Sequence, residues 1–220
     1  MMTAVAEHLQ TPPQPGIRHL LIDLGGVLYE IEIARTVDAY NAMRAPGAPP
    51  IDFGKASQHD MFTALDLGTV DIEAFAAGLR DAYQLQGSLE EIIDIWRRLL
   101  IGVLPQRAEM LRALRAAGYS LALLSNTSRY HYSCYREACE PMFSQMDHLF
   151  FSFDLALRKP DPAIYHKALE LAGWKAGETL FLDDSLTNIE SARQAGLHVW
   201  WVREHEDFDR MVAAYVAANA

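Results

Sequence analysis

The sequence predicts an α/β fold: a Rossmann-like parallel sheet core with an inserted helical domain. From residue 105 to the C-terminus, short apolar runs alternate with helical segments, an arrangement typical of parallel strands joined by right-handed crossovers. An earlier apolar run, HLLIDLGGVL at 19–28, ends in an acidic residue and two glycines. This is the pattern of a buried parallel strand that opens into a tight turn. Between these parts, residues 31–102 have a helical texture without a clear strand.

Four segments follow from these patterns. Residues 1–16 end in TPPQPG, and their proline density and lack of periodicity predict a disordered N-terminal tail. The core domain comprises 17–28 and 104–220, and the inserted domain comprises 29–103. Helices of the insertion are expected at 32–44, 52–66, 71–84 and 88–101. The last of these has the apolar stripe of an amphipathic helix, with positions i, i+3, i+4, i+7 and i+8 occupied by Ile92, Ile95, Trp96, Leu99 and Leu100.

The second part of the core is expected to begin with a helix at 105–117, which ends at Gly118. The elements expected after it are strand 119–125, a helix from about 128, strand 148–153, helix 161–172, strand 179–184, helix 185–195, strand 197–202 and a final helix. We found no internal repeat and no low-complexity segment.

Composition narrows the possible functions. With 220 residues, 50% of them hydrophobic, the chain is long enough for one α/β domain and a modest insertion. No apolar run approaches the roughly 20 residues of a membrane span, and the start has no basic leader, so we expect a cytoplasmic protein without a membrane partner. A net charge of −10 argues against a nucleic-acid partner. Cys134 and Cys139 are expected to be reduced thiols. No residue pattern indicates an oligomeric state.

Polar residues follow four strands of the predicted sheet. In open parallel sheets, ligands bind beyond the carboxyl ends of the strands. The residues at those ends are Asp23, the pair Ser125 and Asn126, the pair Arg158 and Lys159, and the pair Asp183 and Asp184. We therefore expect all four groups to converge on one site.

The residue types at these ends suit phosphoryl transfer. Asp23, followed by Gly25 and Gly26, can aim a carboxylate oxygen at a phosphorus atom with little obstruction from its own loop. The charge that develops on the phosphoryl oxygens needs prearranged cations and donors. Lys159 supplies a compact cation and Ser125 a hydroxyl, and backbone amides near Leu24 and Asn126 could add donors.

The carboxylates also predict a metal site. Asp183 and Asp184, facing Asp23, would repel one another unless a hard cation lay between them, and Mg²⁺ prefers oxygen ligands. Each piece has a structural alternative. The Asp-Asp pair could cap the helix beginning near Leu186, Lys159 could be an exposed loop charge, and Ser125-Asn126 could be turn residues. Their occurrence in order at four strand ends favours a functional site.

Four runs carry a resemblance to a known family. LLIDLGGVLY, LLSNTS, RKPDPAIYHKAL and LFLDDSLTNIESARQAG resemble the ordered motifs of the haloacid dehalogenase-like (HAD) hydrolase superfamily, from residue 19 to 202. The helical stretch 29–103 lies where that superfamily inserts its small helical cap domain. LDLGTVDIEAFAAGLR is similar to the cap segment of a subgroup that includes bacterial sugar-phosphate phosphatases, and SNTSRYH is similar to the α-glucose-1-phosphate phosphatases of that subgroup.

The resemblance implies a Mg²⁺-dependent phosphatase that hydrolyses a small phosphorylated metabolite, such as glucose 1-phosphate, through an aspartyl-phosphate intermediate. It also implies a role for each matching residue. The nucleophile and metal ligand is Asp23; the metal site is completed by the Gly25 carbonyl and Asp184, with Asp183 acting directly or through water; Ser125 and Asn126 hold the phosphoryl group, Lys159 neutralises it and Asn188 braces the loop.

One position departs from the family pattern. Most phosphatases of the superfamily have a second aspartate two residues after the nucleophile, as general acid and base, and here that residue is Gly25. Such assistance is typically worth about 10²–10⁴-fold in rate. Some members of the resembled subgroup share the glycine and still act as phosphatases. A substrate with an acidic leaving oxygen, such as an anomeric one, would need less help; a water or a side chain could also replace the aspartate, with His131, Tyr29 and Arg129 as candidates.

Gly25 leaves three alternatives open. True haloacid dehalogenases also lack the second aspartate, although Asp183 and Asp184 argue against them, because displacing a halide needs no magnesium. A regulator in which turnover has decayed would bind phosphate without hydrolysing it. A phosphoryl-transfer mutase is disfavoured because mutases usually depend on the missing aspartate.

Overall fold

The core is a single parallel sheet with β1 at its centre. The computed structural model describes residues 9–51 and 60–219. Strand order is β5-β4-β1-β6-β7, and every neighbouring pair is parallel. The strands are β1 (His19–Ile22), β4 (Ser120–Ser125), β5 (His148–Phe151), β6 (Thr179–Asp183) and β7 (His198–Trp201). The prediction of a parallel α/β core is confirmed.

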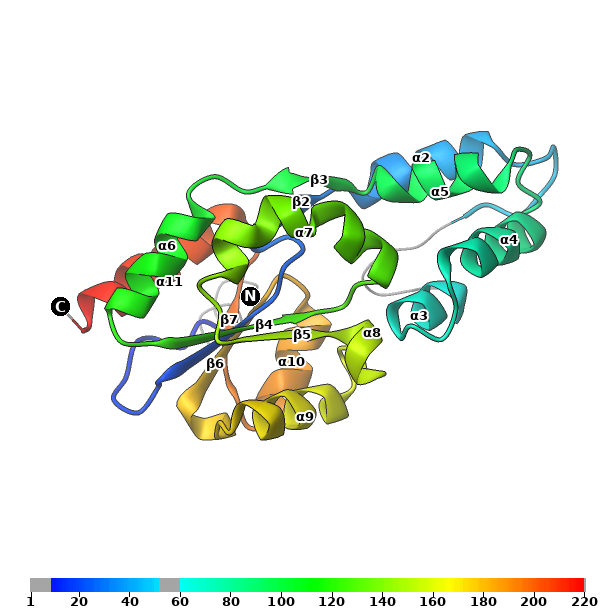
Figure 1. Ribbon diagram of the computed structural model, residues 1–220. Helices are drawn as coiled ribbons and strands as arrows, with labels where there is room; N and C mark the ends of the chain where they lie inside the picture. Colours follow the sequence, from blue (N-terminus) through cyan, green and yellow to red (C-terminus); the bar gives the residue numbers. More distant parts are fainter. Residues whose placement is uncertain (1–8, 52–59, 220) are drawn as a thin grey trace, which may run out of the picture.

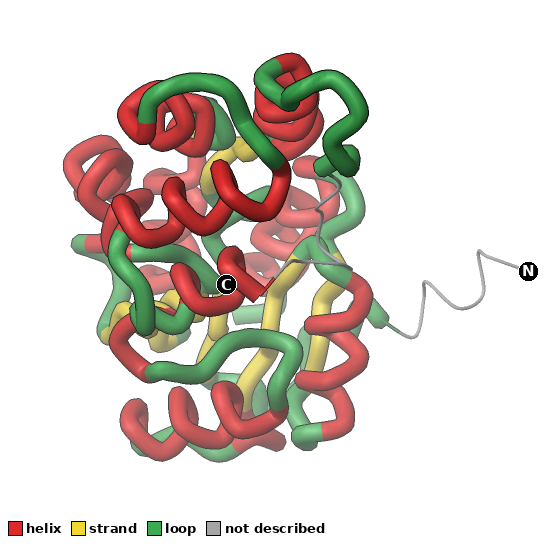
Figure 2. Tube along the Cα trace, turned by 90° about the vertical axis from the view of Figure 1, so that its right-hand side faces the viewer, coloured by secondary structure: helices red, strands yellow, loops and turns green. Residues whose placement is uncertain are grey.

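Helices cover both faces of this sheet (Figures 1 and 2). Leu20 and Ile22 of β1 point to one face, whereas Leu21 points to the other, because successive side chains of a strand alternate. The first face is covered by α6 (Arg107–Ala116), α7 (Arg129–Phe143) and α11 (His205–Ala217), and the second by α9 (Pro162–Ala172) and α10 (Leu186–Gln194). With both faces buried, the carboxyl-end edge of the sheet is where polar side chains meet.

The inserted domain has a core of its own. It contains α2 (Ile33–Ala42), α3 (Asp60–Asp66), α4 (Ile72–Tyr83) and α5 (Leu89–Arg97), which lie together at one end of the molecule (Figure 1). Phe62, Phe75 and Trp96 form a cluster of buried rings with centroids 5.2–5.3 Å apart. Residues 52–59 of the helix expected at 52–66 lie outside the described residues. We call this helical domain the cap.

The cap is joined to the core by a two-stranded ribbon that sequence analysis missed. Strand β2 (Tyr29–Ile31) pairs antiparallel with β3 (Leu100–Val103). The helix predicted at 88–101 is therefore too long at its C-terminus, since α5 ends at Arg97. Leu99 and Leu100 continue the helical stripe in sequence, but the backbone of this stretch pairs with a strand about seventy residues earlier, and such a partner leaves no local pattern.

Part of the predicted disordered tail is ordered. Leu9 is buried, Gln10 forms a bridge with Trp200, and the Thr11 backbone N–H donates to Val199 O at 2.9 Å. The prediction for 1–16 is thus wrong for residues 9–16, because the edge strand β7 offers unpaired backbone groups that this segment satisfies. Residues 1–8 lie outside the described residues.

The remaining observations concern the end of one strand, the two cysteines and the length of the helices. The strand expected at 148–153 ends at Phe151, where the short helix α8 (Ser152–Leu155) begins; a 3₁₀ turn, η1 (Ala176–Glu178), precedes β6. Cys134 and Cys139 are both free thiols, as expected. Among the described residues, none of the helices has the length and apolar character to cross a membrane.

Candidate active site

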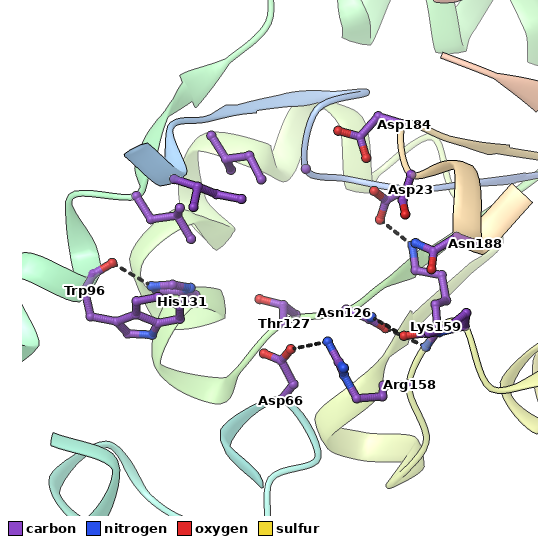
Figure 3. A pocket seen from close by; sticks show the side chains of 16 residues that line it. Asp23, Asp66, Trp96, Asn126, Thr127, His131, Arg158, Lys159, Asp184 and Asn188 are labelled. Carbon is purple, nitrogen blue, oxygen red and sulfur yellow. Dashed lines mark hydrogen bonds and ion pairs between the residues drawn. The ribbon is translucent and has the colours of Figure 1, made fainter. Parts of the chain in front are cut away.

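A cavity of about 170 Å³ lies at the carboxyl end of β1, lined by residues of both the core and the cap. Figure 3 shows these side chains converging. Core residues that line it include Asp23, Gly25, Asn126, Thr127, His131, Arg158, Lys159, Asp184, Ser185 and Asn188, and cap-side residues include Ile31, Ile33, Asp66, Trp96 and Leu99. One half of the cavity is therefore charged and the other half largely apolar.

Lys159 links two of the predicted carboxylates. Its Nζ donates to Asp23 Oδ1 at 2.7 Å, to Asp183 Oδ2 at 2.7 Å and to Leu124 O at 2.9 Å. The residue is only 2% exposed, so all three ammonium protons are used inside the protein. Burial alone would lower the pKa of Lys159, but the two carboxylates outweigh it and raise the pKa above its ordinary value. Lys159 is a fixed cation beside Asp23.

The backbone of Lys159 is held by Asn126. Asn126 Nδ2 donates to Lys159 O at 2.8 Å, and Lys159 N donates to Asn126 Oδ1 at 2.9 Å. This reciprocal pair ties the loop after β4 to the loop before α9. The Asn126 side chain thereby positions Lys159, and Asn126 itself also lines the cavity.

Asp183, at the end of β6, is surrounded by donors. Besides Lys159, Asp183 accepts from Ser185 N at 2.8 Å and from Asn188 Nδ2 at 3.0 and 3.1 Å. Four contacts therefore hold a carboxylate that is completely buried. Asn188 braces this loop through Asp183, and Asp183 in turn orients the Lys159 ammonium.

Three carboxylates form a group suited to a cation. Asp23, Asp183 and Asp184 each offer an oxygen, and these oxygens lie within 4.8 Å of one another. Residue 26 is a glycine with φ +80°, and a Cβ there would lie 1.9 Å from Asp184 Oδ2, so the turn leaves room for that carboxylate. Burial raises the pKa of Asp23 to about 6, against the effect of Lys159. An oxygen-only cluster of this kind fits Mg²⁺.

Ser125 lies at the end of β4 as predicted, but it is 3% exposed and is not among the described residues that line the cavity. Thr127, two residues further on, does line it. Its backbone N–H and C=O both contact Ser152 Oγ, at 3.0 Å each. No expected role falls on Thr127 from the sequence pattern. Its only signal was its place in the SNTS run.

Gly25 lines the cavity next to Asp23, so the position that would carry a second carboxylate faces the site. Of the three candidate replacements, Tyr29 and Arg129 are not among the described lining residues. Tyr29 packs against Tyr135 with ring centroids 5.7 Å apart, and Arg129 pairs with Asp154 at 2.9 Å. Only His131 lines the cavity.

His131 is a neutral hydrogen-bond acceptor. Its Nε2 lies 3.1 Å from Trp96 O, and since a carbonyl only accepts, Nε2 carries the ring proton. Burial lowers the pKa of His131 to about 4, with the Trp96 carbonyl opposing. The ring also stacks on Trp96, with centroids 4.8 Å apart. At neutral pH, Nδ1 therefore has a lone pair and no proton.

Asp66, at the end of α3, is a second cavity residue to which no sequence pattern pointed. Its Oδ2 accepts from Arg158 Nη2 at 3.2 Å, and the side chains are 15% and 22% exposed. Burial raises the pKa of Asp66 to about 6, although Arg158 acts in the opposite direction. The only signal was the LDLGTVD segment, whose aspartates cannot be assigned to a pocket from spacing.

A buried carboxylate at the end of a central parallel strand lies beside a fixed lysine and an acidic group that could hold a cation, and this arrangement suits the hydrolysis of phosphate monoesters. The family of haloacid dehalogenase-like hydrolases matches residues 17–196, and the chain belongs to it.

Relatives of this chain include phosphatases. The chain is 27% identical over 192 residues to D-ribitol-5-phosphate phosphatase of Bacteroides thetaiotaomicron, covering 84% of this chain and 91% of the relative. It is 27% identical over 201 residues to phosphoglycolate phosphatase of Xylella fastidiosa, covering 86% and 83%. A crystal structure of a HAD family enzyme from Bacteroides thetaiotaomicron, in complex with magnesium and inorganic phosphate, superimposes with a TM-score of 0.70 at 26% identity, covering 84% of this chain and 94% of that one.

Proposed function

We propose that this chain is a Mg²⁺-dependent phosphatase of small sugar or polyol phosphates that works through an aspartyl-phosphate on Asp23. The observation that carries the proposal is the placement of Asp23: it lies beside the Lys159 ammonium at 2.7 Å and within reach of two further carboxylates. A bound Mg²⁺ would neutralise the carboxylates and the phosphoryl oxygens. Asp23, Asp184 and the Gly25 carbonyl are the proposed ligands.

The residues around Asp23 divide the remaining work. Oδ1 of Asp23 accepts from Lys159, so the carboxylate is held in one orientation for attack on phosphorus. Asp183 already accepts from Lys159, Ser185 and Asn188. Its proposed role is to orient Lys159 and to contact the cation through water. We assign Asn126 and Thr127, which line the cavity, to the phosphoryl group, and Ser125 to the shape of the loop that presents them.

The cavity suits a small metabolite. Its volume of about 170 Å³ is below the usual ~300–1,000 Å³ of drug-sized sites. Apart from the carboxylate group, the cavity offers the acceptor Nδ1 of His131 and the Asp66–Arg158 pair to hydroxyl groups, next to the apolar side chains of Trp96 and Leu99. A sugar or polyol phosphate satisfies both parts. The relative that acts on D-ribitol 5-phosphate supports this class.

A substrate panel tests the proposal. We expect turnover of sugar and polyol phosphates, among them D-ribitol 5-phosphate, glucose 1-phosphate and glucose 6-phosphate, with loss of activity in EDTA and recovery with Mg²⁺. Asp23→Asn should abolish turnover and the acid-labile phosphoryl group. Full Mg²⁺-dependent activity in Asp23→Asn would show that Asp23 is not the nucleophile. Release of halide from 2-haloacids without phosphatase activity would favour the dehalogenase alternative, and phosphate binding without turnover would favour the regulator.

A further inference from the structure

We propose that Asp66, from the cap, is the general acid and base of the reaction in place of the carboxyl group that is absent at position 25. The inference rests on the proposed phosphatase function and assigns a residue to the one step that the core leaves unassigned. Gly25 faces the cavity but has no side chain to donate a proton. We therefore look for a side-chain donor elsewhere on the cavity wall.

Elimination among the described lining residues leads to Asp66. Lys159 uses its three protons on Asp23, Asp183 and Leu124 O. The proton of His131 points to Trp96 O, and the Arg158 guanidinium does not release one. Among the carboxyl groups, Asp23 and Asp184 belong to the acidic group that binds the cation. Among the described residues, Asp66 is the remaining titratable group that lines the cavity.

Asp66 lies on the side from which the leaving group departs. Figure 3 shows Asp66 across the cavity from Asp23 and Asp184, with Asn126 and Thr127 between the two sides. Attack and departure are roughly in line in phosphoryl transfer. An ester oxygen leaving a phosphorus atom that Asp23 attacks therefore moves toward the Asp66 side.

The cap segment that carries Asp66 is fixed to the core. Ser152 Oγ donates to the backbone O of Asp66 at 2.6 Å, and Arg158 Nη2 donates to its carboxylate at 3.2 Å. Gly68 packs so closely that a Cβ there would lie 2.9 Å from Phe153 O. These contacts hold the Asp66 carboxyl relative to the core without using both of its oxygens on Arg158.

The protonation state of Asp66 suits both half-reactions. Among the described residues, the charged group in contact with Asp66 is Arg158, which favours the carboxylate, and the His131 that lines the same cavity is neutral; burial outweighs Arg158 and raises the pKa of Asp66 to about 6. In the first half-reaction, an Asp23 oxygen bonds to phosphorus, the phosphorus–ester oxygen bond breaks, and Asp66 gives its proton to that oxygen. In the second, Asp66 takes a proton from water, whose oxygen bonds to phosphorus as the bond to Asp23 breaks.

Leaving groups of different acidity test this role. Phenyl phosphate needs a proton on its leaving oxygen, whereas the more acidic phenol of p-nitrophenyl phosphate departs without one. In Asp66→Asn, we expect kcat/KM for phenyl phosphate to fall by about 10²–10⁴-fold and that for p-nitrophenyl phosphate to stay within about tenfold of wild type. Phosphoenzyme should accumulate with p-nitrophenyl phosphate, because the base for the second half-reaction is missing.

Two further variants separate chemistry from structure. Asp154→Asn removes an exposed carboxylate that pairs with Arg129, and it should leave kcat/KM unchanged for both phenyl phosphate and p-nitrophenyl phosphate. Adding Gly25→Asp to Asp66→Asn should restore phenyl phosphate turnover. Gly25 has no positive φ, and the atom nearest to a Cβ there would be Cδ1 at the flexible end of Ile31, at 3.1 Å.

The outcomes distinguish this inference from the proposed function. If kcat/KM in Asp66→Asn falls equally for both esters, or falls for neither, the role of Asp66 is wrong and the proposed phosphatase function still stands. If the wild-type protein shows no Mg²⁺-dependent turnover of either ester, the proposed function fails and the role of Asp66 fails with it.

Discussion

The Asp184 carboxylate lies where a side chain on Gly26 would be: a Cβ on residue 26 would lie 1.9 Å from Asp184 Oδ2. The missing side chain is what allows the Asp184 carboxylate to approach those of Asp23 and Asp183. The glycine also adopts φ +80°, which disfavours other residues. The turn after the nucleophile thus serves the cation site as much as it serves Asp23.

Gly26→Ala should therefore weaken the cation site. We expect the Mg²⁺ concentration for half-maximal activity to rise by at least about tenfold, because Asp184 must move away. Gly118→Ala is the matched control: Gly118 has φ +94° with no atom within 4 Å of its Cβ position, so it has the backbone strain without the clash. If Gly118→Ala raised the Mg²⁺ concentration for half-maximal activity as much as Gly26→Ala, backbone strain and not the clash with Asp184 would explain the rise. If neither variant raised it, the prediction would be wrong.

Lys159→Met should destabilise the protein and abolish turnover. The substitution leaves two buried carboxylates without their shared cation, which typically lowers the free energy of unfolding by about 3–5 kcal/mol. Urea unfolding in EDTA measures this change, and Mg²⁺ should restore part of the loss. Lys167→Met, in an exposed pair with Glu170, should change stability by less than about 1 kcal/mol. Similar losses for the two lysines would contradict our assignment.

Asn188→Ala should alter metal dependence more than the chemistry. Asn188 donates to both oxygens of Asp183, and loss of such supporting contacts usually lowers metal affinity by about 10–100-fold. Activity titrated with Mg²⁺ should shift accordingly, with most of the rate recovered at saturation. Thr187→Ala, which removes a contact with Ser185 Oγ on the same turn, should leave the titration unchanged. An unchanged titration in Asn188→Ala would show that Asp183 needs no brace.

His131 should make the protein less stable in weak acid. Because its folded pKa is lowered from 6.5 to about 4, the unfolded chain binds the proton more readily, and stability from this group is present above pH 6.5 and lost as pH falls toward 4. The full loss is roughly 3 kcal/mol. Urea unfolding between pH 7 and pH 4.5 should show a shallower pH dependence in His131→Gln than in wild type. His166→Gln, at an exposed histidine, should follow wild type; identical slopes for all three proteins would contradict the prediction.

The sequence by itself determined the fold and most of the polar half of the candidate site. Alternating apolar runs and helical segments are local patterns, and in a parallel sheet the residue that follows each strand must lie at the same edge. Asp23, Lys159, Asp183 and Asp184 therefore came together as expected, although Lys159 and Asp23 are 136 residues apart. Their catalytic roles remain predictions.

Only the tertiary structure decided the cap side of the cavity. The contact between Asp66 and Arg158 spans 92 residues, and the β2–β3 ribbon and the pairing of Gln10 with Trp200 also join distant segments. None of these contacts follows from a strand end or a helical period. The tertiary structure also left His131 as the one of the three candidate proton donors that lines the cavity, and it directs the Nε2 proton of His131 to Trp96 O. Contacts between separately folded segments depend on how the cap packs against the core, and that packing leaves no repeating pattern in the chain.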